Sequence, residues 1–185
     1  MADFYDLPDD LVIDIWGYMY EPEDVESFAL VSKGIYSLST PFLREHNRLK
    51  RQFSKISVDE YRTAETSTPS ELLEKILLSP RSALYIGELR IRSFSCCLNT
   101  ADAPFLSYPK DTLAAFTDAI QHSPLIKASK REHWIREVRK GNDGRILGLI
   151  VMRLTKLQKL EVRGYDSDCD HCLLETLARM EESAE

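Results

Sequence analysis

Two cysteines near the C-terminal end have a spacing that could bind zinc or support thiol–disulfide chemistry. Cys169 and Cys172 are separated by two residues, the second of which is His171. A structural zinc site needs four ligands, and the sequence holds no second pair with this spacing. The adjacent Cys96 and Cys97 would have to supply the other ligands from a distant segment. We therefore expect a polar turn here, with no metal and no cofactor.

The histidines offer candidate bases for a cysteine or serine hydrolase. No Gly-x-Ser-x-Gly elbow and no glycine-rich phosphate loop accompanies them. Histidines at helix ends or on charged helices are ordinarily just solvated, and His122 and His133 fall at such places. We expect no catalytic residues and a chain that is not an enzyme. The four candidates considered are His46, His122, His133 and His171.

Two basic segments could contact phosphate groups. Residues 44–55 carry Lys and Arg almost exclusively among their charges, and residues 127–145 hold seven Lys or Arg together with Trp134, a candidate stacking residue. Three acidic residues dilute the second segment, and the whole chain has a net charge of −6. This balance disfavours nonspecific nucleic-acid binding. A basic-helix nucleic-acid-binding protein remains an alternative interpretation.

The composition is that of a folded protein. Hydrophobic residues make up 43% of the 185 residues and charged residues 29%, so the chain can form one ordinary domain, or a small domain and part of a larger one. The N-terminus is acidic where a secretory signal would be basic. The longest apolar run, residues 146–152, is far too short to span a bilayer. We expect reduced cysteines and a cytoplasmic or nuclear location, or both.

Residues 7–43 form the most informative stretch, because three short amphipathic helix patterns follow one another there. The first begins near Pro8, with acidic residues in its first turn. The second begins at residues 21–24, and the third runs from Val31 or Ser32 to Phe42. The apolar side chains exceed what so small a unit can bury, and this surplus predicts a surface for a partner.

The rest of the chain alternates predicted helices and strands. Residues 43–56 are expected to form a basic helix, and residues 57–67 a linker. Thr68 begins a helix with a capping-box pattern, and Pro80 stops it. Further helices are expected at 111–121, 130–139, 145–154 and 172–181, and strands at 84–91 and 157–162.

The two predicted strands share an apolar spacing. Ile86-x-x-Leu89-x-Ile91 resembles Leu157-x-x-Leu160-x-Val162, and each follows a helix. The spacing is that of strands in leucine-rich repeats, although the two copies lie farther apart than the usual repeat of about 20–29 residues. We interpret them as two parallel strands, each with a covering helix.

Residues 7–43 resemble an F-box. The motif opens at Leu7-Pro8, continues through Pro22-Glu23-Asp24-Val25, and includes Leu30-Val31-Ser32-Lys33. Leu38, Pro41 and Leu43 match its end, and Ile35 stands where many members carry tryptophan. The remainder is similar to fungal F-box proteins with a leucine-rich-repeat-like receptor region, on the pattern of residues 79–91, Trp134-Ile135 and Leu157-x-x-Leu160.

The resemblance implies an α+β fold with three parts: an F-box at residues 4–45, a basic helix and linker at 46–67, and a leucine-rich-repeat-like region at 68–185. It implies a substrate receptor that binds the Skp adaptor of a cullin ubiquitin ligase and an unknown protein substrate. Alternatives are a truncated or ligase-independent F-box protein that binds the adaptor only, and the nucleic-acid-binding protein above. The implied adaptor-binding residues are Leu7, Pro8, Leu11, Ile15, Val31, Ser32, Lys33 and Leu38.

Overall fold

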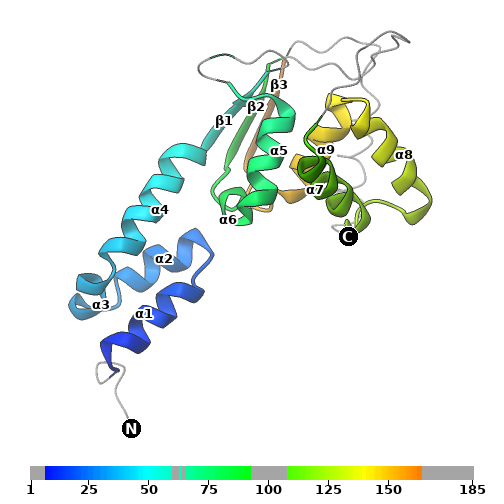
Figure 1. Ribbon diagram of the computed structural model, residues 1–185. Helices are drawn as coiled ribbons and strands as arrows, with labels where there is room; N and C mark the ends of the chain where they lie inside the picture. The colour runs from blue at the N-terminus through cyan, green and yellow to red at the C-terminus, as the bar shows by residue number, and fades with distance from the viewer. Residues whose placement is uncertain (1–6, 60–62, 64–65, 93–107, 164–185) are drawn as a thin grey trace. The chain divides into compact units, whose positions relative to one another are not determined.

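The computed structural model describes residues 7–59, 63, 66–92 and 108–163 (Figure 1). The chain divides into two compact units, Met1–Ser54 and Lys55–Glu185, called here the N-terminal and the C-terminal unit. The fold is mixed and helix-rich, with a small parallel sheet in the C-terminal unit. The α+β class predicted from the sequence is therefore confirmed at this level.

The N-terminal unit is helical. Its helices are α1 (Asp9–Tyr18), α2 (Pro22–Ala29), α3 (Lys33–Leu38) and α4 (Thr40–Phe53) (Figure 1). The predicted starts of α1 and α2 are confirmed. Pro8 precedes α1, and Pro22 occupies the first turn of α2, where its missing N–H would have no partner within the helix. Acidic residues in both first turns complement the positive ends of the helix dipoles.

The predicted third helix is wrong at its C-terminal end. The sequence pattern extended it to Phe42, but α3 ends at Leu38 and α4 begins at Thr40. A proline inside a continuous helix would remove a hydrogen bond and clash with the preceding turn. The chain instead turns at Ser39, whose hydroxyl donates to the carbonyl of Tyr36 at 2.6 Å. Pro41 then lies in the first turn of α4.

Aromatic side chains organise the core of the N-terminal unit. Trp16 is almost completely buried and stacks on Phe42, with ring centroids 5.4 Å apart. Phe28 meets the indole edge-on, with centroids 4.9 Å apart and planes at 67°. Val25 and Phe28 close this core as expected from the sequence. The buried cluster comprises Val12, Trp16, Val25, Phe28, Ala29 and Ile35.

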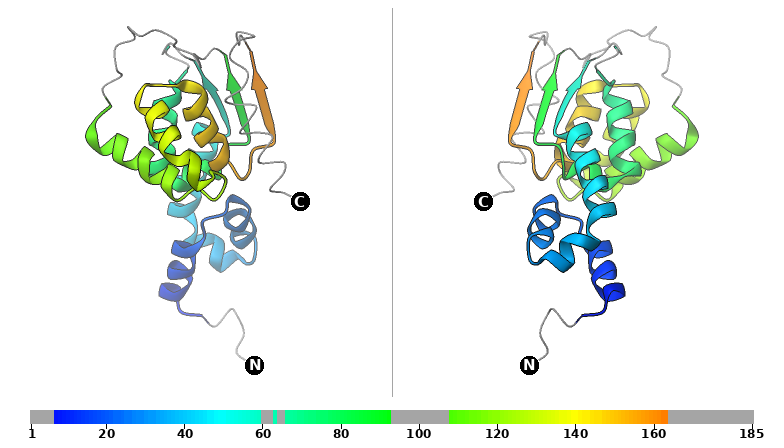
Figure 2. Two further views of the ribbon diagram at one scale, coloured as in Figure 1. Left: turned by 90° about the vertical axis from the view of Figure 1, so that its right-hand side faces the viewer. Right: turned by 90° about the vertical axis from the view of Figure 1, so that its left-hand side faces the viewer.

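The described part of the C-terminal unit contains three parallel strands, where the sequence predicted two. The strands are β1 (Lys55–Val58), β2 (Glu88–Ile91) and β3 (Lys159–Val162), in the order β1-β2-β3 (Figure 2). The predicted parallel pairing of the two later strands is confirmed. Ile56, Leu89 and Leu160 are aligned across the sheet. The missed strand carries the same apolar spacing as the others, in Phe53-x-x-Ile56-x-Val58.

The segment predicted as a basic helix and linker, residues 46–67, also contains a strand. Its first part belongs to α4, which continues to Phe53, and its middle part is β1. The predicted basic helix likewise ends earlier than Ile56, which lies in the strand. The boundary between the two units falls after Ser54, so the N-terminal unit is longer than the predicted F-box at residues 4–45.

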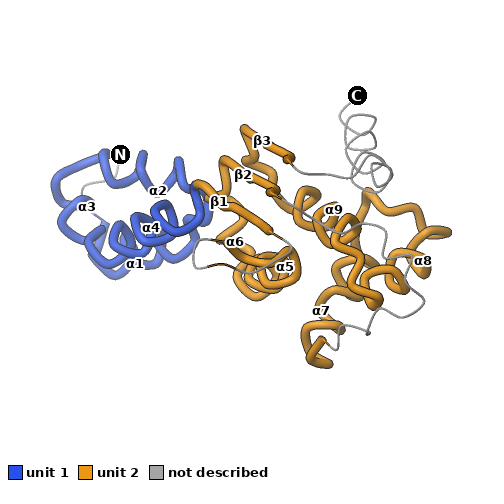
Figure 3. Tube along the Cα trace, turned by 90° about the horizontal axis from the view of Figure 1, so that it is seen from above, with its two compact units in different colours: residues 1–54 blue, residues 55–185 orange. Residues whose placement is uncertain are grey.

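Helices accompany the sheet in the C-terminal unit. Those in the described residues are α5 (Pro69–Leu78), α6 (Pro80–Ala83), α7 (Lys110–Gln121), α8 (Ala128–Arg139) and α9 (Asp143–Arg153). Helix α5 packs against α9, and both lie on the same side of the three strands (Figures 2 and 3). The buried Leu89 and Ile91 of the central strand alternate with charged residues of the opposite face.

The helices and strands predicted within residues 68–163 are present in the C-terminal unit, but several begin or end at other residues than predicted. Pro80 begins the short helix α6 instead of only stopping α5, because proline suits a first helical turn. The predicted strand at 84–91 starts later, at Glu88, because residues 84–86 donate backbone hydrogen bonds back to α6. The predicted helix at 172–181 lies outside the described residues. No helix in the described part of the chain is long and apolar enough to cross a membrane.

The capping box at Thr68 should contribute measurably to stability. The Thr68 hydroxyl accepts from the Glu71 amide at 3.3 Å, and the Glu71 carboxylate accepts from the Thr68 amide at 3.3 Å. We expect Thr68→Ala to lower the free energy of unfolding by about 1 kcal/mol. Urea denaturation followed by circular dichroism measures the change, with Thr68→Ser as the control that keeps the hydroxyl. An equal loss in Thr68→Ser would contradict the assignment.

Candidate protein-docking surface

Residues in and just before the first turn of α1, and most of α3, border a pocket of about 330 Å³ in the N-terminal unit. Half of the predicted adaptor-binding residues line it, namely Leu7, Ser32, Lys33 and Leu38. The sequence placed these residues at the two ends of a stretch of more than thirty positions. The fold brings the two ends together. The full lining is Leu7, Asp9, Val12, Ser32, Lys33, Gly34, Ile35 and Leu38.

The wall that α3 contributes is fixed by a helix cap and by a buried anchor. The Ser32 side chain accepts from the Ile35 amide at 3.2 Å, which satisfies one donor at the start of the helix. Ile35 is buried in the core of the unit. The Val31 amide donates to the Phe28 carbonyl at 3.2 Å and closes the turn after α2. Ser32 therefore has a structural role in addition to lining the pocket.

Exposed apolar side chains adjoin the pocket-lining residues in the sequence. Leu11 on α1 is 49% exposed, Val31 is 50% exposed, and Leu30 is 81% exposed. We call these three residues the exposed apolar trio. Single exposed apolar residues are ordinary on protein surfaces, but a pocket with several beside it is typical of an interaction site. Leu30 and Val31 lie in the turn that positions α3.

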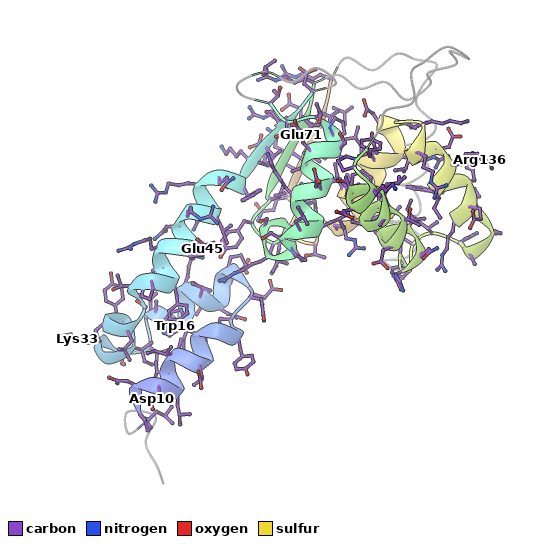
Figure 4. The ribbon with its side chains drawn as sticks, in the orientation of Figure 1. Asp10, Trp16, Lys33, Glu45, Glu71 and Arg136 are labelled. Carbon is purple, nitrogen blue, oxygen red and sulfur yellow. The ribbon has the colours of Figure 1, made fainter. Side chains whose placement is uncertain are left out.

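The pocket carries one charge of each sign. Asp9 and Lys33 both line it, and both are exposed. Figure 4 shows Lys33 pointing outward from α3 and Trp16 in the interior of the unit. A partner surface suited to this pocket would present an apolar side chain between polar or charged groups.

The other predicted docking residues divide between surface and core. Pro8 is exposed, and its carbonyl accepts the amides of Leu11 and Val12 at the start of α1. Ile15 is half-buried and packs against the core cluster. Leu7 and Leu38 also pack against that cluster from the pocket side. The set thus includes side chains that serve the core as well as side chains that face solvent.

The sequence prediction omitted the most exposed aliphatic residue of this surface. Leu30 follows the last helical residue of α2 and belongs to no apolar helix stripe, so periodicity gave no signal for it. Tyr36 on α3 is another exposed residue that was not predicted. One signal in the sequence could have indicated this exposure. Leu30 and Val31 are adjacent apolar residues at the end of a helix, and one apolar helix face cannot bury both side chains.

A polar cluster joins α2 to α4 within the same unit. The buried imidazole of His46 lies 3.1 Å from a Glu26 carboxylate oxygen, and the ammonium of Lys50 lies 2.5 Å from it. The hydrogen bond from Lys50 lowers the pKa of Glu26, and the bond with His46 adds to this against the effect of burial. His46 therefore has a structural role, in the contact between α2 and α4.

The remaining candidates for chemistry are placed as follows. His122 and His133 are exposed on the surface of the C-terminal unit, as expected. The four cysteines and His171 lie outside the described residues. Within residues 7–59, 66–92 and 108–163, no group of three or more His, Cys, Asp or Glu side chains could hold a metal ion.

Trp134 is not available for stacking on a nucleic-acid base. It is buried, and the guanidinium of Arg145 lies 4.7 Å from its ring centroid. This cation–π contact joins α8 to α9, the helix that contains Arg145. The basic residues Arg136 and Arg139 of α8 remain exposed, and Arg136 is labelled in Figure 4.

Comparison of the chain with family models, with curated proteins and with solved structures found no match. The interpretation of the docking surface therefore depends on its residues and geometry.

Proposed function

We propose that the chain is a non-enzymatic adaptor of the F-box type. Its N-terminal unit would bind the Skp adaptor of a cullin ubiquitin ligase, and its C-terminal unit would hold a protein substrate. The supporting observation is the pocket between α1 and α3, together with the exposed apolar trio, whose members are close in the sequence to residues that line it. The F-box resemblance covers the same residues. Other subunits would carry out the ubiquitin transfer, in the cytoplasm, the nucleus or both.

The exposed apolar trio supplies a driving force for such an interaction. Complete burial of a Leu or Val side chain contributes roughly 1.5–3 kcal/mol. Leu30 is mostly exposed, and Leu11 and Val31 are half exposed, so a partner could bury much of their surface. Since about 1.4 kcal/mol corresponds to a tenfold change in affinity, these side chains can dominate binding. Two of the three, Leu30 and Val31, belong to the Leu30-Val31-Ser32-Lys33 segment of the resemblance, and Leu11 lies on α1.

Adaptor binding tests this proposal directly. We expect the full chain to co-purify with a co-expressed Skp adaptor, and the double variant Leu11→Asp/Val31→Asp to lose at least about 100-fold in affinity, because two carboxylates would be buried at the interface. Both positions face solvent, so the unit should stay folded, which circular dichroism checks. Isothermal titration calorimetry with purified adaptor gives the affinities.

Leu78→Asp is the matched control for this experiment. Leu78 is the last residue of α5 in the C-terminal unit, and its side chain is also mostly exposed. The same apolar-to-acidic change at this position should leave adaptor binding unchanged. No binding by the unmodified chain, or equal losses in the control and the double variant, would refute the proposed docking surface.

A further inference from the structure

We propose that the charged face of the sheet binds an acidic segment of a partner protein, a run of Asp and Glu side chains. This inference deepens the proposed function, because the partner would be the substrate held by the C-terminal unit. The role of the partner as a substrate rests on the proposed function. The acidic chemistry of the bound segment is inferred from the sheet alone.

The register of the strands gathers charged residues in rows. Lys55, Glu88 and Lys159 are aligned across the three strands, and in the next row Arg90 is aligned with Glu161. Successive side chains of a strand point to opposite faces, so these residues share one face. The apolar positions between them, such as Leu89 and Ile91, point to the other face, where α5 and α9 lie (Figure 3).

Two carboxylates hold four cations together on this face. Glu88 lies 2.8 Å from Arg90, 3.1 Å from Lys159 and 3.7 Å from Lys55. Hydrogen bonds from Arg90 and Lys159 lower the pKa of Glu88 and keep the carboxylate ionised.

The second carboxylate extends the network to the edge of the sheet. Glu161 lies 3.6 Å from Arg90 and 3.8 Å from Lys159, and it also pairs with Arg163. One residue beyond the strands, Asp59 and Arg92 add one charge of each sign. Among the described residues of this face, cations therefore remain in excess.

The cations form the outer layer of the network. The side chains of Glu88 and Glu161 are only 12% and 24% exposed, whereas those of the four cations are 46–77% exposed. An ammonium has three N–H donors and a guanidinium has five, so the cations retain donors for further carboxylates. A partner that approaches this face meets positive charge on a chain whose net charge is −6.

Charge complementarity and shape favour an acidic protein segment over nucleic acid. Neighbouring strands lie about 4.8 Å apart, so the cations occupy a surface about as wide as one extended chain with its side chains. An acidic segment can place carboxylates against the rows without bringing a long polyphosphate close to the acidic remainder of the molecule.

Fluorescence anisotropy of a labelled Glu-rich peptide with the full chain tests the inference. We expect binding that weakens with added salt, and a loss of at least about tenfold in Arg90→Gln/Lys159→Gln. Arg136→Gln/Arg139→Gln, which removes two exposed cations from α8, should change the affinity less than about twofold. Circular dichroism checks the fold of both variants.

Each other outcome would overturn the inference. Absence of peptide binding would do so, as would equal losses in the two double variants. If a noncognate DNA duplex bound the same face more tightly than the peptide, the inferred ligand would be nucleic acid and not an acidic protein segment. Adaptor binding is measured on residues of the N-terminal unit, so a chain that binds the adaptor but not the peptide would refute this inference and leave the proposed function standing.

Discussion

Replacing Phe28 with alanine is expected to unfold the N-terminal unit. The ring is buried and contacts Trp16 edge-on, so its removal leaves a cavity in an aromatic core. Phe→Ala substitutions in cores cost about 3–5 kcal/mol. A unit of this size has a small core and little stability in reserve. The loss is therefore comparable to the whole stability that such a unit can have.

Tryptophan fluorescence provides the measurement, because the chain has only two tryptophans. In a Trp134→Phe background the emission comes from Trp16 alone, and Phe28→Ala should shift it to longer wavelength as the indole meets water. Tyr18→Ala, which truncates an exposed aromatic residue of α1, should change stability by no more than about 0.5 kcal/mol. Unshifted Trp16 emission in Phe28→Ala would show that this core is described wrongly.

Leu89→Asp is expected to disrupt the sheet of the C-terminal unit. Leu89 is completely buried in the central strand, aligned with Ile56 on one side and Leu160 on the other. An unpaired carboxylate at this position costs several kcal/mol after protonation and relaxation, on top of the lost apolar contact. That cost approaches the total stability of about 5–15 kcal/mol typical of a domain.

Hydrogen exchange measured by mass spectrometry localises this effect. Amides of β2 and β3 should lose protection in Leu89→Asp. Leu89→Ile keeps the apolar volume and should cost less than about 1.5 kcal/mol, with protection retained. If Leu89→Asp kept its protection, the face assigned to the helices would be solvent-exposed and the register would be shifted by one residue.

The starts of the helices could be predicted from the sequence because their signals are local. Pro22 with its acidic neighbours, and Thr68 with Glu71, specify helix starts without help from distant residues. Strand β1 had no comparable signal. It is only four residues long and begins with Lys55, directly after the basic helix α4, so the helical pattern was extended over it. Only its alignment with β2 makes its apolar spacing meaningful.

The docking surface was predictable in part. The motif identified Leu7, Ser32, Lys33 and Leu38, which the fold brings to one pocket. It could not assign each apolar residue to the core or to the surface, because that depends on where neighbouring helices end. The end of α2 at Ala29, for example, leaves Leu30 and Val31 exposed in the turn before α3. The charged face of the sheet could not be predicted from the sequence. Its rows of charged residues depend on the register in which the three strands pair.

The three aligned strands are separated by unequal lengths of chain, and this has a consequence for the order of folding. Pairing of β1 with β2 closes a loop of about 30 residues, whereas pairing of β2 with β3 closes one of about 70, and the entropic cost of closure grows with loop length. The first loop contains α5, whose capped start and short separation from both strands favour early contact. We therefore expect β1, α5 and β2 to associate first, with α9 and β3 completing the sheet afterwards.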